Sequence, residues 1–287
     1  MSRAPIVCID VGGSSLKTGV IQEPGQPFGS YRVMPIDSAG DLTTIIDTFI
    51  DAIQSVNLSN MGGLALSFPG PFDYQHGVCL IEGLHKYAAL YHVNIGDVLR
   101  TRLGLPDLPI HYRNDAHAAV LGEARYGAGQ GFRRVIGVTL GTGCGSAFVV
   151  DGVLATQGAG VPAEGWLYPF PVNGATADDV FSTRGLHARL SAAGLPIDLP
   201  QAAQAARAGD QHYRAIFEAF GRDLGQFLQP FATAFRADAI LILGGIANAF
   251  DCFEAAMRPA LSQPLCVGRL GGWAALLGVG DLFVSSV

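Results

Sequence analysis

Two stretches of this chain follow one plan, in which an apolar strand leads into a glycine-rich turn and a second apolar strand leads back. The first stretch covers residues 6–21 and the second covers residues 135–150, so that Gly141 follows Gly12 at a distance of 129 residues. A glycine hairpin between apolar strands is common, and either one alone is explained equally well as a purely structural turn. Two such hairpins, far apart in one chain, favour a duplicated architecture in which each lobe opens with the same hairpin.

The length and composition agree with two lobes. A chain of 287 residues exceeds the size that one core usually serves. With 49% hydrophobic and 15% charged residues, the chain has enough apolar surface for a large interior. Helical and strand-like patterns alternate, which is typical of α/β proteins. These patterns predict helices at 41–56, 95–103, 116–126, 213–235 and 271–278, and strands at 61–68, 109–112 and 239–243.

The charge and hydropathy patterns argue against several kinds of partner. The formal net charge is -6 and no cluster of lysine or arginine is present, so we expect neither nucleic acid nor an anionic membrane as a partner. Glycines break the apolar stretches before they reach the roughly 18 residues that a membrane helix needs. The chain runs from Met1 into the strand at Ile6 without the apolar region of a signal peptide, which predicts a cytoplasmic protein.

The cysteines indicate neither a disulfide framework nor a thiolate zinc site. No two of them have Cys-x-x-Cys spacing, and their number is odd. We expect buried free thiols at Cys8, Cys79, Cys144, Cys252 and Cys266.

Without a basic patch, a phosphate group has to be bound by the backbone. Glycine has no Cβ to keep phosphate oxygens away from the N–H groups of a turn. Neither a P-loop nor a G-x-G-x-x-G sequence occurs, so the two commonest nucleotide-binding folds are disfavoured. The candidate phosphate-binding residues of the two turns are Gly12, Gly13, Ser14 and Ser15, and Gly141, Thr142 and Gly143. Gly244 and Gly245, after a buried strand, would let an adenosine lie flat against the backbone.

Two acidic residues stand at strand ends. Asp10, just before the first turn, can hold Mg²⁺ through water, or it can simply stabilise the turn. Asp115 follows Asn114 where a strand ends and a helix begins, and there the free N–H groups and the helix dipole favour an ionised carboxylate. Such a group can accept the proton of a substrate hydroxyl as the hydroxyl attacks a γ-phosphate. The alternative for Asp115 is a helix N-cap without a catalytic role.

These motifs, in this order, resemble those of the ROK family (repressors, open reading frames and sugar kinases) within the actin/hexokinase/Hsp70 superfamily. The resemblance extends over nearly the whole chain. Each motif alone is unspecific, whereas the ordered set is specific. The segments that carry it are Ile9-Asp10-Val11-Gly12-Gly13-Ser14, Ser67-Phe68-Pro69-Gly70, Asn114-Asp115-Ala116, Gly122-Glu123, Gly127, Leu140-Gly141-Thr142-Gly143, Ala163-Glu164 and Leu243-Gly244-Gly245.

The resemblance implies a two-lobed actin-like ATPase (ribonuclease H-like) α/β fold with a central cleft. It implies an N-terminal lobe of residues 1–115, completed by a helix at about 271–287, and a larger lobe of residues 116–270. The implied activity is ATP-dependent phosphorylation of a sugar hydroxyl by a glucokinase-like or related hexose or amino-sugar kinase, with Mg²⁺ as cofactor and a homodimer as the assembly.

The resemblance also implies roles for single residues. Asp115 would be the catalytic base, and the sugar pocket would consist of Ser67, Pro69, Gly70, Asn114, Asp115 and Glu164. Asp178 falls roughly where a second sugar-binding acid is expected, and its alternative is a solvated loop acid.

Some segments depart from the family pattern. The third residue after Glu164 is Leu167 where a histidine is usual, and residues 172–179 contain no cysteine, so we expect no structural zinc. Trp166 or Tyr168 would then reshape the wall of the sugar site. A usual Asn-Leu-x-x-Trp segment reads Gly-Leu-His-Lys-Tyr at 83–87. Lys17 is expected to be a solvent-facing strand residue without a role, and His111, His117 and His187 have no metal-ligand spacing.

Other functions are weighed against the kinase. A non-catalytic sugar or nucleotide sensor of the same fold is favoured by the altered sugar-site residues, and opposed by Asp115 and both phosphate turns. A kinase that uses polyphosphate would need a basic track, which the sequence lacks. The family's repressors carry a helix-turn-helix ahead of this strand, and five residues precede Ile6 here, so we expect no DNA-binding role.

Overall fold

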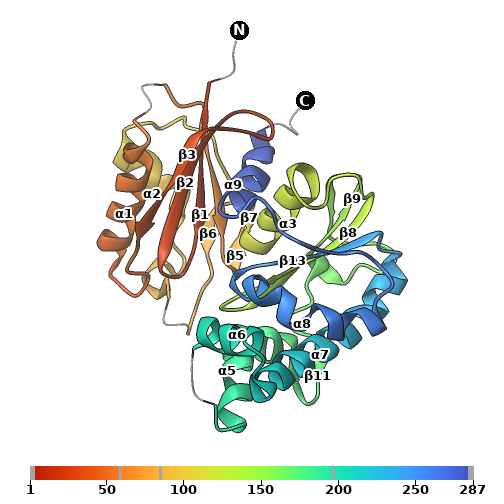
Figure 1. Ribbon diagram of the computed structural model, residues 1–287. Helices are drawn as coiled ribbons and strands as arrows, with labels where there is room; N and C mark the ends of the chain where they lie inside the picture. The colour runs from red at the N-terminus through yellow and green to blue at the C-terminus, as the bar shows by residue number, and fades with distance from the viewer. Residues whose placement is uncertain (1–3, 58–59, 84–85, 196–197, 284–287) are drawn as a thin grey trace. The chain divides into compact units, whose positions relative to one another are not determined.

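The structure, a computed structural model, describes residues 4–57, 60–83, 86–195 and 198–283 (Figure 1). The chain divides into two compact units. Unit 1 comprises Met1–Gly122 and Leu270–Val287, and unit 2 comprises Glu123–Arg269. Each unit contains one five-stranded mixed sheet, so the predicted α/β class is confirmed.

The sheet of unit 1 has the strand order β3-β2-β1-β4-β7. β1 and β2 form the first predicted hairpin, while β1, β4 and β7 run parallel to one another. The strands are β1 (Ile6–Val11), β2 (Ser15–Glu23), β3 (Gln26–Pro35), β4 (Gly63–Phe68) and β7 (Ile110–Asn114), and a small hairpin is formed by β5 (Phe72–Asp73) and β6 (Val78–Cys79).

Helices cover both faces of this sheet. The helices of unit 1 are α1 (Leu42–Ser55), α2 (Ile95–Leu103), α3 (Asp115–Tyr126, which crosses the boundary between the units) and α9 (Trp273–Gly280), with short 3-10 turns at η1 (Ala88–Leu90) and η5 (Asp281–Phe283). Figure 1 shows α1 and α2 on one face and α9 on the other. Val7, Ile9 and Val11 share a core with α1 and α2, so the alternation along β1 turns Asp10 to the α9 side.

The sheet of unit 2 has the order β10-β9-β8-β13-β14. Its strands are β8 (Arg134–Leu140), β9 (Cys144–Val150), β10 (Val153–Ala155), β13 (Ala239–Leu243) and β14 (Leu265–Val267), with a separate hairpin of β11 (Pro171–Val172) and β12 (Ala175–Thr176). The helices are α4 (Ala177–Phe181), α5 (Thr183–Ala192), α6 (Leu199–Arg207), α7 (Gln211–Phe235) and α8 (Phe250–Met257), with 3-10 turns at η2 (Ala163–Gly165), η3 (Gly245–Ala249) and η4 (Arg258–Ala260). A core rich in phenylalanine joins them to the sheet.

The two sheets repeat one topology. In each, the hairpin is antiparallel and its first strand pairs in parallel with the next strand of the sheet. The repeated hairpin is therefore confirmed as the start of both sheets. The turns differ, because Val11 pairs with Leu16 across four residues, whereas Leu140 pairs with Cys144 across three.

The patterned segments are found where they were predicted. The helix at 95–103 and the strand at 239–243 have the predicted bounds, and the helices at 41–56, 116–126, 213–235 and 271–278 differ from α1, α3, α7 and α9 by one or two residues at their ends. Pro230 lies inside α7. Within the described ranges, none of the helices combines the length and the apolar character that a bilayer crossing requires.

Candidate active site

Three parallel strands of unit 1 bring polar residues to one edge of the sheet. β1, β4 and β7 end near Asp10, Ser67 and Asn114, and the register pairs Asp10 with Ser67 and Phe68 with Asn114. The carboxyl ends of parallel strands meet at one edge, which is where open α/β sheets bind ligands. The Ser67 hydroxyl, fully buried, donates a hydrogen bond of 3.0 Å to Oδ1 of Asp10.

The other oxygen of Asp10 is held by Lys17. The Nζ of Lys17 lies 2.7 Å from Oδ2 of Asp10, and the two residues face each other across the β1–β2 hairpin. The expectation that Lys17 is a solvent-facing residue without a role is thus corrected. The contact depends on the register of the hairpin, in which the four-residue turn sets Lys17 opposite Asp10.

This environment bears on the magnesium ion that the fold implies. Each oxygen of Asp10 accepts one hydrogen bond and keeps a further lone pair. That arrangement fits a hydrated Mg²⁺ held through water, whereas direct coordination would compete with Lys17. Among the residues that the structure describes, no group of three or more acidic, histidine or cysteine side chains is placed to hold a metal.

Three carbonyl groups of the Gly12–Ser15 turn accept hydrogen bonds from neighbouring residues. The Tyr87 hydroxyl donates to the Gly12 carbonyl at 2.5 Å, the Ser38 hydroxyl donates to the Gly13 carbonyl at 2.5 Å, and the Ile36 N–H donates to the Ser14 carbonyl at 3.1 Å. The N–H groups of Gly13 and Ser14 bond to no protein group within the described ranges. An anion at this turn would therefore meet the N–H donors of Gly13 and Ser14. The carbonyl oxygens of Gly12, Gly13 and Ser14 are already hydrogen-bonded and would not repel it as free acceptors.

Asn114, rather than Asp115, has the geometry of the cap of α3. Its Oδ1 accepts from the N–H groups of Ala116 and His117 at 3.1 and 3.2 Å. Asp115 accepts from the Ala116 N–H at 2.8 Å through Oδ1. Since Asn114 satisfies two of the free N–H groups of the helix, the carboxylate of Asp115 is not needed for capping alone.

The protonation of Asp115 is set by its surroundings. The pKa of the carboxyl is raised to about 6. Burial is the largest cause and the charge of Asp10 acts in the same direction, while the backbone N–H groups of Ala116 and Asp115 and the charge of Lys86 lower it. A carboxylate with this pKa is ionised at neutral pH and is a stronger base than a solvated aspartate.

The loop after β4 lies beside Asn114. The Asn114 Nδ2 donates to the Tyr74 hydroxyl at 3.1 Å, and that hydroxyl donates to the Phe68 carbonyl at 3.1 Å. Gly70 is exposed, and a Cβ there would lie 3.3 Å from the Tyr74 hydroxyl. Pro69 is buried. The predicted residues Asp10, Ser67, Gly70, Asn114 and Asp115 are thus gathered in unit 1 with the Gly12–Ser15 turn.

In unit 2 the second turn and the Gly244 segment lie against each other. The Gly141 N–H donates to the Gly143 carbonyl at 3.0 Å, so the turn is tight. Gly244 has a φ of +88°, and a Cβ at this position would lie 2.3 Å from the Leu140 carbonyl oxygen. Only glycine fits this contact. Gly245 and Gly141 both face open space.

Asp178, in α4, contacts the Gly141–Gly143 turn. Its Oδ1 accepts the Cys144 N–H at 2.7 Å, and its Oδ2 lies 3.1 Å from Nη2 of Arg184. A Cβ on Gly143 would come within 2.9 Å of Oδ1. These contacts fix the turn, and the predicted sugar-binding role of Asp178 stays a prediction.

Glu164 is exposed and has an unusual backbone conformation. Its φ is +56°, in the left-handed region that a residue other than glycine seldom adopts. The neighbouring backbone is anchored to β9, because the buried Ser146 hydroxyl donates to the Gly165 carbonyl and accepts from the Leu167 N–H, both at 2.8 Å. Strained residues of this kind cluster at ligand sites.

A family model described as the ROK family matches residues 6–269 of this sequence. The chain belongs to the ROK family. A glucokinase of Thermotoga maritima is 26% identical over 284 residues, which cover 90% of this chain and 87% of that protein. A glucokinase of Halalkalibacterium halodurans is 27% identical, with 98% of this chain and 96% of that protein covered.

A solved structure gives the same result for the fold. The crystal structure of a ROK family glucokinase from Streptomyces griseus, in complex with glucose and AMPPNP, matches with a TM-score of 0.76 at 25% identity. The match covers 97% of this chain and 98% of that chain. The expected fold class, that of the actin-like ROK kinases, is confirmed.

Where this ROK chain departs from the family pattern, it has its own local structure. Leu167, at the position of the usual histidine, is fully buried in the core of unit 2. Its neighbours Trp166 and Tyr168 stay outside that core with ring centroids 5.8 Å apart. The region expected to lack a zinc loop is the β11–β12 hairpin, whose Asn173 and Gly174 have the positive φ angles of a tight two-residue turn. In the segment 83–87, Leu84 and His85 lie outside the described residues.

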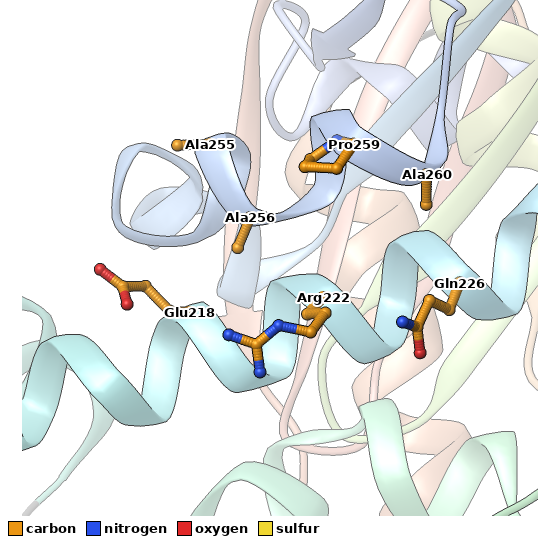
Figure 2. Close-up of a pocket in the computed structure, with 7 residues that line it drawn as sticks. All are labelled: Glu218, Arg222, Gln226, Ala255, Ala256, Pro259 and Ala260. Atoms are coloured by element: carbon orange, nitrogen blue, oxygen red, sulfur yellow. The ribbon is translucent and has the colours of Figure 1, made fainter.

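A separate groove lies between α7 and α8. It has a volume of about 630 Å³ and is lined by Glu218, Arg222, Gln226, Ala255, Ala256, Pro259 and Ala260 (Figure 2). None of the predicted site residues lines it. It is therefore not part of the candidate active site.

Proposed function

We propose that this chain is an ATP-dependent sugar kinase in which Asp115 is the general base. The observation that carries the proposal is the carboxylate of Asp115, with a raised pKa, at the strand edge that also holds Asp10 and the Gly12–Ser15 turn. The relatives named glucokinase and the related structure with glucose and AMPPNP support the same reaction.

The phosphates of ATP would be bound by backbone donors. In unit 1 these are the N–H groups of Gly13 and Ser14, and in unit 2 the Gly141–Gly143 turn with the hydroxyl of Thr142. Gly244 and Gly245 would lie against the adenosine. Magnesium, held through water by Asp10, would neutralise charge on the phosphates when bound.

The sugar would be held by polar side chains near Asp115. Asn114, whose Oδ1 caps α3, has its Nδ2 directed to Tyr74 and offers a donor at this place. Ser67, Pro69 and Gly70 would form one wall of the pocket, and Glu164 and Asp178 would bind further hydroxyls. The homodimer implied by the resemblance belongs to the same proposal.

The proposed reaction transfers one proton, forms one phosphorus–oxygen bond and breaks another. The sugar hydroxyl donates its proton to the carboxylate of Asp115, and its oxygen bonds to the γ-phosphorus. The bond from that phosphorus to the oxygen bridging the β-phosphate breaks, and ADP leaves. An ionised Asp115 is needed to accept the proton, which its pKa of about 6 provides at neutral pH.

The proposal is tested by ADP release from ATP and Mg²⁺ in the presence of a panel of hexoses, amino sugars and polyols. We expect at least one sugar to stimulate release. We expect Asp115→Asn to lower kcat on the order of a thousandfold, because general-base catalysis contributes at about this level. Asp107→Asn, an exposed aspartate of unit 1, is the matched control and should behave like the wild type.

The alternatives give different results. Binding of sugar or nucleotide in a thermal-shift assay without sugar-stimulated ADP release would favour the non-catalytic sensor. Near-normal turnover by Asp115→Asn would remove Asp115 as the base. Turnover with polyphosphate in place of ATP would identify the other donor.

A further inference from the structure

Lysine is very rare in this protein. Of its 18 lysine and arginine residues only two are lysines, Lys17 and Lys86, and the others are all arginine. Both lysines lie at the Gly12–Ser15 turn, although they are far apart in the sequence. Lys17 is already paired with Asp10 at 2.7 Å.

Lys86 is brought to this turn by its neighbour Tyr87. Tyr87 is fully buried, and its hydroxyl donates to the Gly12 carbonyl at 2.5 Å. Its backbone N–H donates to the Ser38 carbonyl at 2.5 Å, and the Ser38 hydroxyl in turn binds the Gly13 carbonyl. These bonds fix the backbone of Lys86 beside the turn. The Cδ of Lys86 lies 3.8 Å from the position that a Cβ on Gly13 would occupy, and the residue is partly exposed.

The charge of Lys86 also acts on the proposed base. It lowers the pKa of Asp115, against the larger effect of burial and the effect of Asp10. The ammonium group is therefore within electrostatic range of Asp115 while its stem lies over Gly13. This is the path along which a phosphoryl group would pass, from the backbone donors of the turn to a hydroxyl at Asp115.

We propose that Lys86 is a further catalytic residue, which binds the oxygens of the phosphoryl group while it is transferred. This inference rests on the proposed kinase function. Phosphoryl transfer is catalysed largely by positioning and by cations placed against the equatorial oxygens. In this step the proton of the hydroxyl goes to Asp115, the hydroxyl oxygen bonds to the γ-phosphorus, and the bond from that phosphorus to the oxygen bridging the β-phosphate breaks.

The choice of lysine agrees with this role. An ammonium is a compact charge on a flexible stem with donors that rotate freely, whereas a guanidinium binds a phosphate in a fixed two-point geometry. A flexible point charge can follow the phosphorus as it moves. Lys17 cannot replace Lys86 without giving up its ion pair with Asp10.

The rarity of lysine allows a test that needs no turnover. An amine-reactive acylating reagent can modify only Lys17, Lys86 and the α-amino group, and peptide mass mapping follows each one. The wild-type protein is labelled alone, with Mg²⁺ and AMPPNP, and with Mg²⁺ and ADP. We expect AMPPNP to slow the labelling of Lys86 about tenfold or more, because a charged hydrogen bond to the terminal phosphate holds the amine, and ADP to slow it much less. Equal protection by both nucleotides, or none by either, would overturn the proposal.

Kinetics of variants provide the second test. Lys86→Met removes the charge and keeps the length, Lys86→Arg keeps the charge, and Arg32→Met removes a positive charge from an exposed position on β3 of the same unit. We expect Lys86→Met to lower kcat on the order of a hundredfold with little change in the KM for sugar. Lys86→Arg should recover part of the rate, and Arg32→Met should equal the wild type.

The outcomes separate this inference from the proposed function. A kcat of Lys86→Met within about twofold of the wild type would contradict a contact in the transition state. Thermal unfolding checks that each variant folds. If Lys86→Met does not fold, the rate of Lys86→Arg and the labelling of the wild type test the proposal instead. If the wild type releases no ADP with any sugar, the kinase proposal fails. Protection by AMPPNP and not by ADP would still establish the contact of Lys86 with the terminal phosphate.

Discussion

Asp10 and Asp115 are two carboxylates near one sheet edge with different hydrogen-bond environments. Asp10 accepts from Lys17 and Ser67, so each of its oxygens has a donor. Asp115 accepts from the N–H of Ala116 through one oxygen. Burial, followed by the neighbouring charge of Asp10, raises the pKa of Asp115 to about 6. A buried carboxylate whose pKa lies near neutrality can exchange a proton during turnover.

The activity should follow the ionisation of Asp115. Because the base must be deprotonated, kcat/KM should rise with pH through about 6 and level off above about pH 7, with roughly one tenth of the plateau at pH 5. The measurement is kcat/KM between pH 4.5 and 8.5, with circular dichroism as the control for folding at each pH. A profile that stays flat down to pH 5 would contradict the assignment.

The same group should weaken the fold at neutral pH. The pKa of Asp115 in the folded protein is about 6 against 3.8 for the free group, so the native state binds the proton more tightly between these values. Stability is then lost as the pH rises from about 4 to about 6. Asp115→Asn should raise the free energy of unfolding at pH 8 by up to about 3 kcal/mol, at about 1.4 kcal/mol per pH unit, and leave it nearly unchanged at pH 3.5. Urea denaturation of both proteins at the two pH values checks this, with Asp107→Asn as the control, and an equal effect at both pH values would contradict it.

Single residues were predictable from sequence where their role depends on local structure. Asp10 and Asn114 were found because each stands at a strand end. The contact of Lys17 with Asp10 required the register of the hairpin, which depends on how many residues the turn contains. The position of Lys86 was not predictable, because the bond between Tyr87 and Gly12 joins residues 75 positions apart.

At the scale of elements, α3 and α9 cross with their backbones in contact. A Cβ on Gly278 would lie 1.8 Å from the Ala118 carbonyl oxygen, and one on Gly122 would lie 2.0 Å from the Ala274 carbonyl oxygen. Neither neighbour is a flexible side chain that can move aside. Glycine at both positions is therefore required for α9 to pack on α3 and on the sheet of unit 1.

Gly278→Ala should be strongly destabilising. The added methyl group must push the two helices apart, so we expect a loss of about 3 kcal/mol or more in the free energy of unfolding. Gly29→Ala is the comparison, because Gly29 has a φ of +74° and open space around it, and should lose only about 1 kcal/mol. Denaturant unfolding of the two variants measures the difference. Equal losses of unfolding free energy in the two variants would mean that α3 and α9 can move apart without a large energetic cost.

Elements were predicted where the apolar period is clear. α2 and β13 have a clear apolar period, and their predicted bounds equal the observed ones. β3 is an edge strand whose residues are all exposed or partly exposed, so it has no alternation to detect. α4 is too short for a helical period, although the reciprocal bonds between Thr176 and Asp179 are a helix start that the sequence displayed.

The whole molecule contains one sheet topology twice, but the two units are built from the chain in different ways. Unit 2 is one continuous segment, Glu123–Arg269, with its own core. Unit 1 needs the end of the chain, because Ala274, Ala275, Leu276, Leu277 and Val279 of α9 are all buried. The repeated hairpin indicated the duplication. The packing of α9 on unit 1 is a tertiary contact, which the hydrophobic periodicity of the sequence does not show and which only the family resemblance implied.

Removal of the chain after Arg269 should therefore affect the two units unequally. Without α9, the face of β1 and β4 that it covers becomes exposed, and unit 1 loses a buried apolar helix. Unit 2 keeps every strand of its sheet. We expect hydrogen exchange of the truncated protein to retain slow amides in β8, β9 and β13, and to lose protection in β1, β2 and β4. Gly29→Ala in the full-length chain is the control for a mild loss of stability in unit 1. Loss of protection in both sheets together would show that the units fold as one cooperative structure.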